Sequence, residues 1–121
     1  DLYDVNVKVP KFEVVDQGKE VFDTVWRFNK PLSNHIHPTM KPVALCARGI
    51  LNSSRKGEIV FEPFAGSGST LIACETGRRC RAIELDPVYC DVIIKRYINW
   101  VGRSSDVYLI RNSEKLAYSS L

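Results

Sequence analysis

The sequence has few features that would indicate a membrane protein, a secreted protein or a metal-binding site. Its 121 residues contain no apolar run of about 18 residues and no signal peptide, so neither a membrane span nor secretion is expected. The two histidines, His35 and His37, have no further ligand nearby in sequence, and we expect no metal site. The four cysteines form no Cys-x-x-Cys pair and no zinc spacing, which predicts reduced thiols in a cytoplasmic core.

A strong charge imbalance is also missing. The net charge is +3, with 45% hydrophobic and 26% charged residues, which describes an ordinary globular chain of one domain at most. This charge permits binding to nucleic acid without requiring it. Basic residues gather at Arg78, Arg79 and Arg81 and again at Lys95 and Arg96. Two interpretations of these basic residues stay open: they lie on a solvated helix end and face, or they contact phosphate.

The most informative stretch is EIVFEPFAGSGST at 58–70, in which an apolar run leads into a loop with Gly66 and Gly68. Glycine lets a backbone turn sharply and approach a ligand closely. A second predicted strand, RAIELD at 81–86, carries Glu84 about 20 positions after the first glycine, where a carboxylate can accept both ribose hydroxyls. Together these features predict a ligand that contains adenosine.

Two absences narrow the choice of adenosine ligand. No lysine follows Gly68, so the loop is not a phosphate-binding P-loop, and Leu71 stands where a dinucleotide fingerprint has its third glycine. S-adenosylmethionine has no pyrophosphate and needs a carboxylate for its ribose, an apolar bed for adenine and close backbone contact with its methionine end. The glycine loop, Glu84 and the neighbouring Leu85 fit these needs.

Three segments resemble motifs of amino-group DNA methyltransferases of the beta arrangement, in which the cofactor motifs come last. They are HPTMKP at 37–42, FEPFAGSGST at 61–70 and AIELDPVYC at 82–90. The resemblance covers roughly residues 24–102, in the family's order and spacing. It implies the C-terminal, cofactor-binding part of a cytoplasmic enzyme that methylates double-stranded DNA with S-adenosylmethionine, as in restriction-modification.

The resemblance also implies roles for individual residues. In that family the first two segments clasp the methionine moiety of the cofactor, and the acidic residue of the third holds the ribose. Carried over, these roles fall on His37, Thr39, Lys41, Phe64, Gly66, Gly68, Thr70 and Glu84. Glu62 stands where the family usually has Asp, one methylene shorter, and its expected contact is the cofactor's amino group. Leu85 is expected beside the adenine.

The catalytic motif of the family, an Asp, Asn or Ser followed by Pro-Pro-Tyr, is missing, because the sequence contains no Pro-Pro pair. Its role is to orient the exocyclic amine of a flipped base toward the methyl group. In the beta order it would precede residue 1, and the only methionine is Met40, so we expect the tail of a longer protein. We therefore assign no catalytic residue and expect the chain alone to be inactive.

Several functions stay open at this point. Adenine is preferred over cytosine as the target base, because DVIIKR at 91–96 is similar to adenine-type members. The alternative to an enzyme is a catalytically incomplete module or remnant that binds an adenosine ligand without turnover. An oxidoreductase with a dinucleotide site is a third hypothesis, against which Leu71 and the HPTMKP segment argue.

The predicted fold is α/β, a partial Rossmann-like methyltransferase fold of three layers preceded by a β-hairpin. Three regions are expected: a hairpin and loop over 1–36 at the exit of a target-recognition region, a cofactor-binding half over 37–111 and a frayed tail over 112–121. The elements expected are hairpin strands at 11–16 and 20–28, helices at 42–53, 69–75 and 86–101, and strands at 58–62, 81–85 and 107–110. An unpaired edge of the parallel sheet predicts a homodimer or strand exchange.

Overall fold

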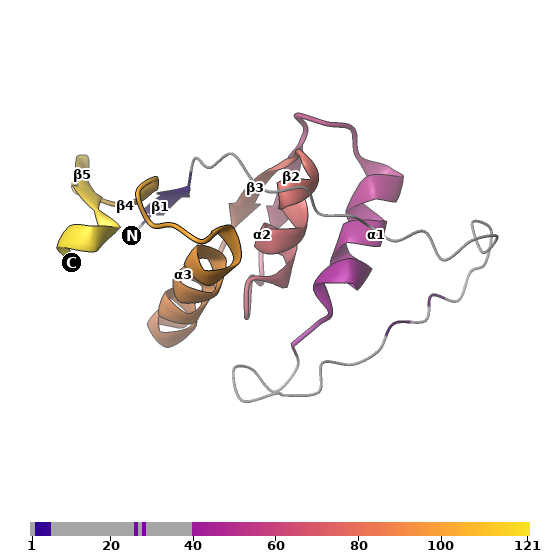
Figure 1. Ribbon diagram of the computed structural model, residues 1–121, viewed down its shortest axis with the longest axis horizontal. Coiled ribbons are helices and arrows are strands. Elements are labelled where there is room, and N and C mark those ends of the chain that lie inside the picture. The colour runs from indigo at the N-terminus through magenta and orange to yellow at the C-terminus, as the bar shows by residue number, and fades with distance from the viewer. Residues whose placement is uncertain (1, 6–25, 27, 29–39) are drawn as a thin grey trace.

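The computed structural model describes residues 2–5, 26, 28 and 40–121 (Figure 1). In chain order its elements are β1 Leu2–Val5, α1 Val43–Ser53, β2 Ile59–Glu62, α2 Ser69–Ala73, the 3-10 helix η1 Cys74–Thr76, β3 Arg79–Ala82, α3 Pro87–Val101, β4 Val107–Arg111, β5 Glu114–Ala117 and the 3-10 helix η2 Tyr118–Ser120.

Most of the predicted hairpin, and the loop at 29–36, lie outside the described residues. Of the second predicted strand, Trp26 and Phe28 are described, and neither belongs to a strand. The guanidinium carbon of Arg48 in α1 lies 4.7 Å from the centre of the Trp26 ring. This contact places Trp26 against α1.

The centre of the fold is the β2–α2–β3 unit, in which β2 and β3 pair in parallel from Ile59 opposite Arg79 to Glu62 opposite Ala82. Parallel strands need a crossover connection, which α2 and η1 supply. Beyond the strand ends, the Ile83 amide donates to the Glu62 carbonyl and the Ala65 amide donates to the Ile83 carbonyl, both at 2.9 Å. The predicted α/β class is confirmed, and the loop at 63–68 starts where the two strands end.

The strand predicted at 81–85 begins and ends earlier, at Arg79 and Ala82. Pairing with β2 sets this register, because the Arg79 amide donates to the Glu58 carbonyl at the start of β2. Arg79 therefore belongs to the strand instead of preceding it, and Glu84 follows the strand in a loop. Ile83 and Leu85 are apolar, and in the sequence they favour a strand that ends after Ala82.

The helices cover one face of this parallel pair. Figure 1 shows α2 between α1 and α3, in front of β2 and β3. Val60 and Cys80 are half-buried, whereas Ile59 and Phe61 on the opposite face are 55% and 64% exposed. The buried apolar residues are Ala47, Ile72, Ala73, Cys74, Ile94, Tyr97, Val107 and Leu109. The predicted fold has three layers. The described residues form two of them, the sheet and one layer of helices.

Helix α3 has the ends that the sequence predicts. The Asp86 carboxylate accepts from the Val88 amide at 2.9 Å, Pro87 lies in the first turn, and Gly102 ends the helix with φ of 76°. The helical spacing of Val88, Val92, Ile93, Tyr97 and Trp100 predicts a buried stripe, which is partly wrong because Val88 and Trp100 are exposed. The helix is held to the rest of the fold through residues 93–97, and both of these side chains lie beyond that contact.

The expectation of a frayed end at 112–121 is wrong. Strand β5 pairs antiparallel with β4, and β1 pairs with the other edge of β4, giving the order β1-β4-β5. Asn112 and Ser113 connect the hairpin with φ of 51° and 66°, the positive values of a two-residue hairpin turn. Asn-Ser is a weaker turn signal than Asn-Gly, so this strand has only a faint signature in the sequence.

Candidate functional site

The Glu84 carboxylate fixes the glycine loop to the end of β3. Its Oε2 accepts from the Gly66 amide at 2.7 Å and its Oε1 accepts from the Asp86 amide at 3.0 Å. A carboxylate offers about four acceptor positions. The side chain is oriented by the backbone before any ligand arrives, and it can accept hydrogen bonds from a vicinal diol.

The Glu62 carboxylate fixes the other end of the loop. Its Oε1 accepts from the Phe64 amide and its Oε2 from the Thr70 hydroxyl, each at 2.9 Å. Glu62 thus closes the turn that its own strand enters and joins it to the first turn of α2. These two contacts occupy the carboxylate that was expected to face an amino group of the ligand, and its further acceptor positions still permit that contact.

A pocket of about 90 Å³ lies above the loop. Its lining comes from the end of β2, the loop, α2, α1 and the segment before α1, and comprises Lys41, Cys46, Glu62, Phe64, Ala65, Gly66, Ser67, Ser69 and Thr70. The Ser69 hydroxyl donates to the Lys41 carbonyl at 2.8 Å, which joins the HPTMKP segment to the loop. Two segments that are far apart in the sequence therefore meet at one pocket.

The predicted site residues divide into three groups. Lys41, Glu62, Phe64, Gly66 and Thr70 line the pocket together. The others that the structure describes lie around it: Glu84 contacts the loop, Leu85 follows Glu84 and is 94% exposed, and Gly68 is buried at the end of the loop. His37 and Thr39 lie outside the described residues. The exposed Phe64, at 85%, and Leu85 offer apolar surface at the mouth of the site.

Four residues of the site were missed or given another role by the sequence. By residue type Ser69 or Ser67 can cap the start of α2, but the N-cap is Gly68 without a side-chain cap bond, and both serine hydroxyls accept hydrogen bonds from Arg96 instead. Cys46 lies at helical spacing with Val43, Ala47 and Ile50, which predicts only an apolar side of the helix. A helical stripe carries no sign of a pocket, and Arg96 is too far along the chain for a local motif to include it.

Burial raises the pKa of the Cys46 thiol above its ordinary value, and a hydrogen bond with Thr70 opposes this increase. The thiol is therefore protonated at neutral pH and adds a weakly polar wall to the pocket.

Of the basic residues around β3, Arg78 has a structural role. Its Nε donates to the Ser54 hydroxyl at 3.0 Å and its Nη1 to the Thr76 carbonyl at 2.8 Å. Arg79 donates from Nε to the Gly57 carbonyl at 3.2 Å. These bonds hold the turn before β2 against the turn before β3. They account for the positions of both arginines without a phosphate.

The described part of the chain offers no metal-binding cluster. Residues 40–121, with the short stretches before them, contain no group of three or more side chains that could hold a metal ion. The same residues include no helix long and apolar enough to cross a bilayer.

A family model described as DNA methylase matches residues 4–96. Among curated proteins, the chain is 46% identical over 61 residues to the DNA adenine methyltransferase YhdJ of Escherichia coli strain K12, covering 50% of this chain and 21% of that protein. It is 38% identical over 66 residues to the orphan methyltransferase M.BamHII of Bacillus amyloliquefaciens, covering 54% of this chain and 25% of the relative. The type II methyltransferase M2.DpnII of Streptococcus pneumoniae is 41% identical over 61 residues, with coverage of 50% and 23%.

A solved structure is similar as well. It is a protein of Thermus thermophilus described as a DNA modification methylase and crystallised with S-adenosyl-L-methionine, with 33% identity, a TM-score of 0.48 and coverage of 62% of this chain and 28% of that one.

The chain spans only about a fifth to a quarter of the length of the curated relatives that it matches. The family model, in contrast, matches most of the chain and includes both the Lys41 segment and the glycine loop. The resemblance seen in the motifs is confirmed by this family model. This chain belongs to the DNA methylase family.

Proposed function

We propose that residues 37–111 bind S-adenosylmethionine at the carboxyl ends of β2 and β3. Glu84 accepts the ribose hydroxyls, Leu85 lies beside the adenine, and the pocket receives the methionine end. The observation that carries this proposal is the Glu84 carboxylate, which the Gly66 and Asp86 amides hold at the end of the second parallel strand. A ligand with a ribose and no phosphate fits a loop that has no lysine after its glycines.

The methionine end of the cofactor is assigned to the pocket on its polar lining. Lys41, Glu62 and Thr70 line it together with Ser67 and Ser69, and these polar side chains match an amino acid with both an ammonium and a carboxylate group. A volume of about 90 Å³ suits this end alone, so the nucleoside extends over the exposed Phe64 and Leu85. His37 and Thr39, from the same segment as Lys41, complete the proposed set.

The proposed reaction is methyl transfer to an exocyclic amine of a base in double-stranded DNA. The amine nitrogen forms a bond to the methyl carbon as the carbon–sulfur bond of the sulfonium breaks, S-adenosylhomocysteine leaves, and the amine loses a proton. The cofactor site contributes alignment of the methyl group. Adenine is the proposed base over cytosine, supported by the likeness to the adenine methyltransferase of Escherichia coli.

The wider setting is proposed on the same likenesses. A restriction-modification role is proposed on the likeness to the type II methyltransferase of Streptococcus pneumoniae, and the proposed location is the cytoplasm. Residues 1–36 are assigned to the exit of a target-recognition region, and the base-orienting residues to a part of the enzyme outside these 121 residues.

A second candidate function is a module that binds the cofactor without turnover. The absence of any Pro-Pro pair in the 121 residues favours it, because no Pro-Pro-Tyr motif is present to orient a base. On both hypotheses the chain alone does not methylate DNA. Label found in duplex DNA after incubation with the chain and methyl-labelled S-adenosylmethionine would overturn that statement.

Calorimetric titration of the chain with S-adenosylmethionine and S-adenosylhomocysteine tests the proposal. Loss of hydrogen bonds to a charged group costs about 1.5–3 kcal/mol, so Glu84→Ala is expected to weaken binding by about 10- to 150-fold. The control is Glu114→Ala, which removes an exposed carboxylate from β5 in the other sheet. Equal affinity in the Glu84 variant, or no heat at millimolar ligand from a chain that circular dichroism shows folded, would refute the proposal.

A further inference from the structure

Arg96 reaches from α3 to the back of the glycine loop. A single nitrogen, Nη1, donates to the Ser67 carbonyl at 3.0 Å, to the Ser67 hydroxyl at 3.0 Å and to the Ser69 hydroxyl at 2.9 Å. Ser67 and Ser69 are each only 5% exposed. The guanidinium therefore donates hydrogen bonds to the two buried polar side chains on either side of Gly68.

This placement carries an electrostatic cost. Arg96 is half-buried, and burial lowers its pKa below the ordinary value of arginine, an effect that the nearby Cys46 thiol partly opposes. Within residues 40–121 its hydrogen bonds go to neutral oxygens, and no carboxylate forms an ion pair with it. Because a buried charge without an ion pair is expensive, a purely solvated surface role does not explain this geometry.

The hydrogen bonds continue through the loop to the segment on its other side. Ser69 accepts from Arg96 and donates its own hydroxyl proton to the Lys41 carbonyl at 2.8 Å. A hydroxyl has a single proton to donate, so the bond from Arg96 leaves that proton directed at Lys41. Arg96, Ser69 and Lys41 thus connect α3, the loop and the segment before α1 across the pocket.

The same face of α3 shapes the loop sterically. Gly68 has φ of +82°, and a Cβ added there would lie 3.0 Å from Cγ2 of Ile93, one helical turn before Arg96. Ile93 therefore supports the loop from below while Arg96 binds the residues on both sides of Gly68. Since Ser67 and Ser69 also line the pocket, the support lies directly behind the surface that a ligand would touch.

We propose that Arg96 is a positioning residue of the pocket. It holds residues 66–69 in the ligand-binding shape, fixes the Lys41 segment through Ser69, and gives the pocket a positive potential that favours an anionic group. The part concerning the anion rests on the proposed function, because it assigns the carboxylate of the methionine end to this pocket. The part concerning loop order requires no ligand.

The first test measures amide hydrogen exchange in Arg96→Met, Arg96→Lys and the control Lys95→Met, which alters the exposed neighbour on α3. Arg96→Met is expected to speed exchange of the Gly66 and Gly68 amides by about tenfold or more, with the β4 and β5 amides unchanged. Arg96→Lys is expected to restore part of the protection, because all three bonds come from one nitrogen and the planar fork of arginine is not needed. Lys95→Met is expected to match the unaltered chain.

Unchanged loop exchange in Arg96→Met would overturn the proposal, as would a uniform increase across every element, which indicates only lower global stability. If Arg96→Met does not fold, the exchange rates of the loop amides in Arg96→Lys decide the test. A smaller increase confined to the loop supports the proposal, and an unchanged or uniform result contradicts it.

The second test compares S-adenosylhomocysteine with 5′-methylthioadenosine, which has the same nucleoside but no amino-acid end. Arg96→Met is expected to weaken S-adenosylhomocysteine by at least about tenfold and 5′-methylthioadenosine much less, whereas Glu84→Ala weakens both. Equal weakening of the two ligands by Arg96→Met would contradict the electrostatic part. If the unaltered chain binds neither ligand, the proposed function fails, and the exchange result still decides the role of Arg96 in the loop.

Discussion

Gly68 shows how a single residue sets the shape of the loop. Its φ of +82° is costly for any residue with a Cβ, and that Cβ would meet Ile93 at 3.0 Å. Gly57 has nearly the same φ, +83°, but nothing lies within 4 Å of a Cβ added there. A substitution at each of the two glycines therefore separates the cost of backbone strain from the cost of steric conflict.

Gly68→Ala is expected to lower the free energy of unfolding by about 2–5 kcal/mol, the sum of the strain and overpacking costs. Gly57→Ala is expected to lower it by about 1–2 kcal/mol, because only the strain applies. Urea denaturation followed by circular dichroism measures both. Equal losses in the two variants would show that α3 does not hold the loop closely.

Cys80 is expected to be the most reactive thiol of the chain. A hydrogen bond from the Cys74 thiol lowers the pKa of Cys80, whereas burial raises the pKa of Cys46 and of Cys90 above the usual thiol value. A lower pKa gives more thiolate at pH 7.5, and Cys80 is only half-buried. Timed labelling with iodoacetamide and peptide mass spectrometry should find Cys80 modified first. Faster labelling of Cys46 or Cys90 would contradict this order.

The site could be predicted from the sequence only where its residues belong to motifs. Glu62, Gly66 and Thr70 lie in a continuous string, and the pocket contains all three. Arg96 comes 27 residues after Ser69, and only the packing of α3 brings them together. Side chains that support a loop from another element leave no local pattern.

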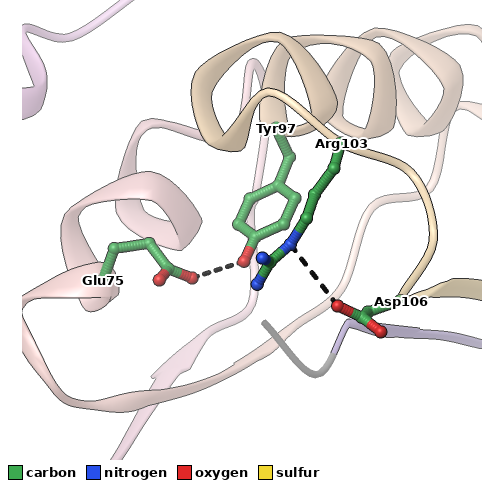
Figure 2. A network of polar contacts seen from close by, with 4 residues as sticks. All are labelled: Glu75, Tyr97, Arg103 and Asp106. Carbon is green, nitrogen blue, oxygen red and sulfur yellow. Dashed lines mark hydrogen bonds and ion pairs between the residues drawn. The ribbon is translucent and has the colours of Figure 1, made fainter. Parts of the chain in front are cut away.

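At the scale of elements, Tyr97 ties α3 to η1. Figure 2 shows its hydroxyl directed at Glu75, with Arg103 and Asp106 close by. The hydroxyl donates to Oε1 of Glu75 at 2.6 Å, and the Tyr97 ring is buried. The ion pair of Arg103 with Asp106, 3.5 Å long and 45% and 39% exposed, contributes only about 0–1 kcal/mol. The phenol and the carboxylate are therefore the stronger link.

Tyr97→Phe is expected to lower the free energy of unfolding by about 1.5–3 kcal/mol, because it leaves a partly buried carboxylate without its donor. The ring still fills the same space, so the loss reports the hydrogen bond. Asp106→Asn, which weakens only the exposed ion pair, serves as the control in the same denaturation experiment. A loss in Tyr97→Phe no larger than that of the control would contradict the assignment.

Glu75 also makes stability depend on pH. Burial raises the pKa of its carboxyl above the ordinary value, and the Tyr97 hydrogen bond only partly offsets this. The folded state then binds more protons than the unfolded state just above the ordinary pKa of Glu, so this residue's contribution to stability falls as pH rises through the raised pKa. Glu75→Gln removes this contribution. Its free energy of unfolding relative to the unaltered chain should increase between about pH 4.5 and pH 7.5. A constant or decreasing difference would reverse the sign.

The helices were easier to predict than the strands. Pro42, Asp86 and Gly102 mark helix ends by local stereochemistry, and the structure places the ends at those residues. The limits of β3 and the existence of β5 depend on pairing with β2 and β4, which are distant or weakly signalled in sequence. Register is a property of two strands, so one strand's residues do not determine it.

At the scale of the whole molecule, the open face of the parallel pair stands out. Ile59, Phe61 and Ile83 are between 55% and 64% exposed there. Parallel sheets are normally covered on both faces, and unpaired sheet edges bind further strands. The prediction that the isolated chain forms a homodimer or exchanges strands follows from this surface.

Sedimentation velocity of the chain at high micromolar concentration checks this prediction. The unaltered chain should sediment as a dimer or larger species, and Phe61→Lys should shift it toward monomer without changing the circular dichroism spectrum. Leu116→Lys, at an exposed apolar position of the other sheet, is the control and should leave the association unchanged. A monodisperse monomer before any substitution would contradict the prediction.

The proposed cofactor site lies at the carboxyl ends of β2 and β3. A titration of the isotopically labelled chain with S-adenosylhomocysteine, followed by amide resonances in NMR spectra, tests it most directly. Saturable shifts are expected at Gly66, Gly68 and Leu85, with the amides of β4 and β5 unmoved. Shifts centred on the β4–β5 hairpin, or none at millimolar ligand from a folded chain, would contradict it.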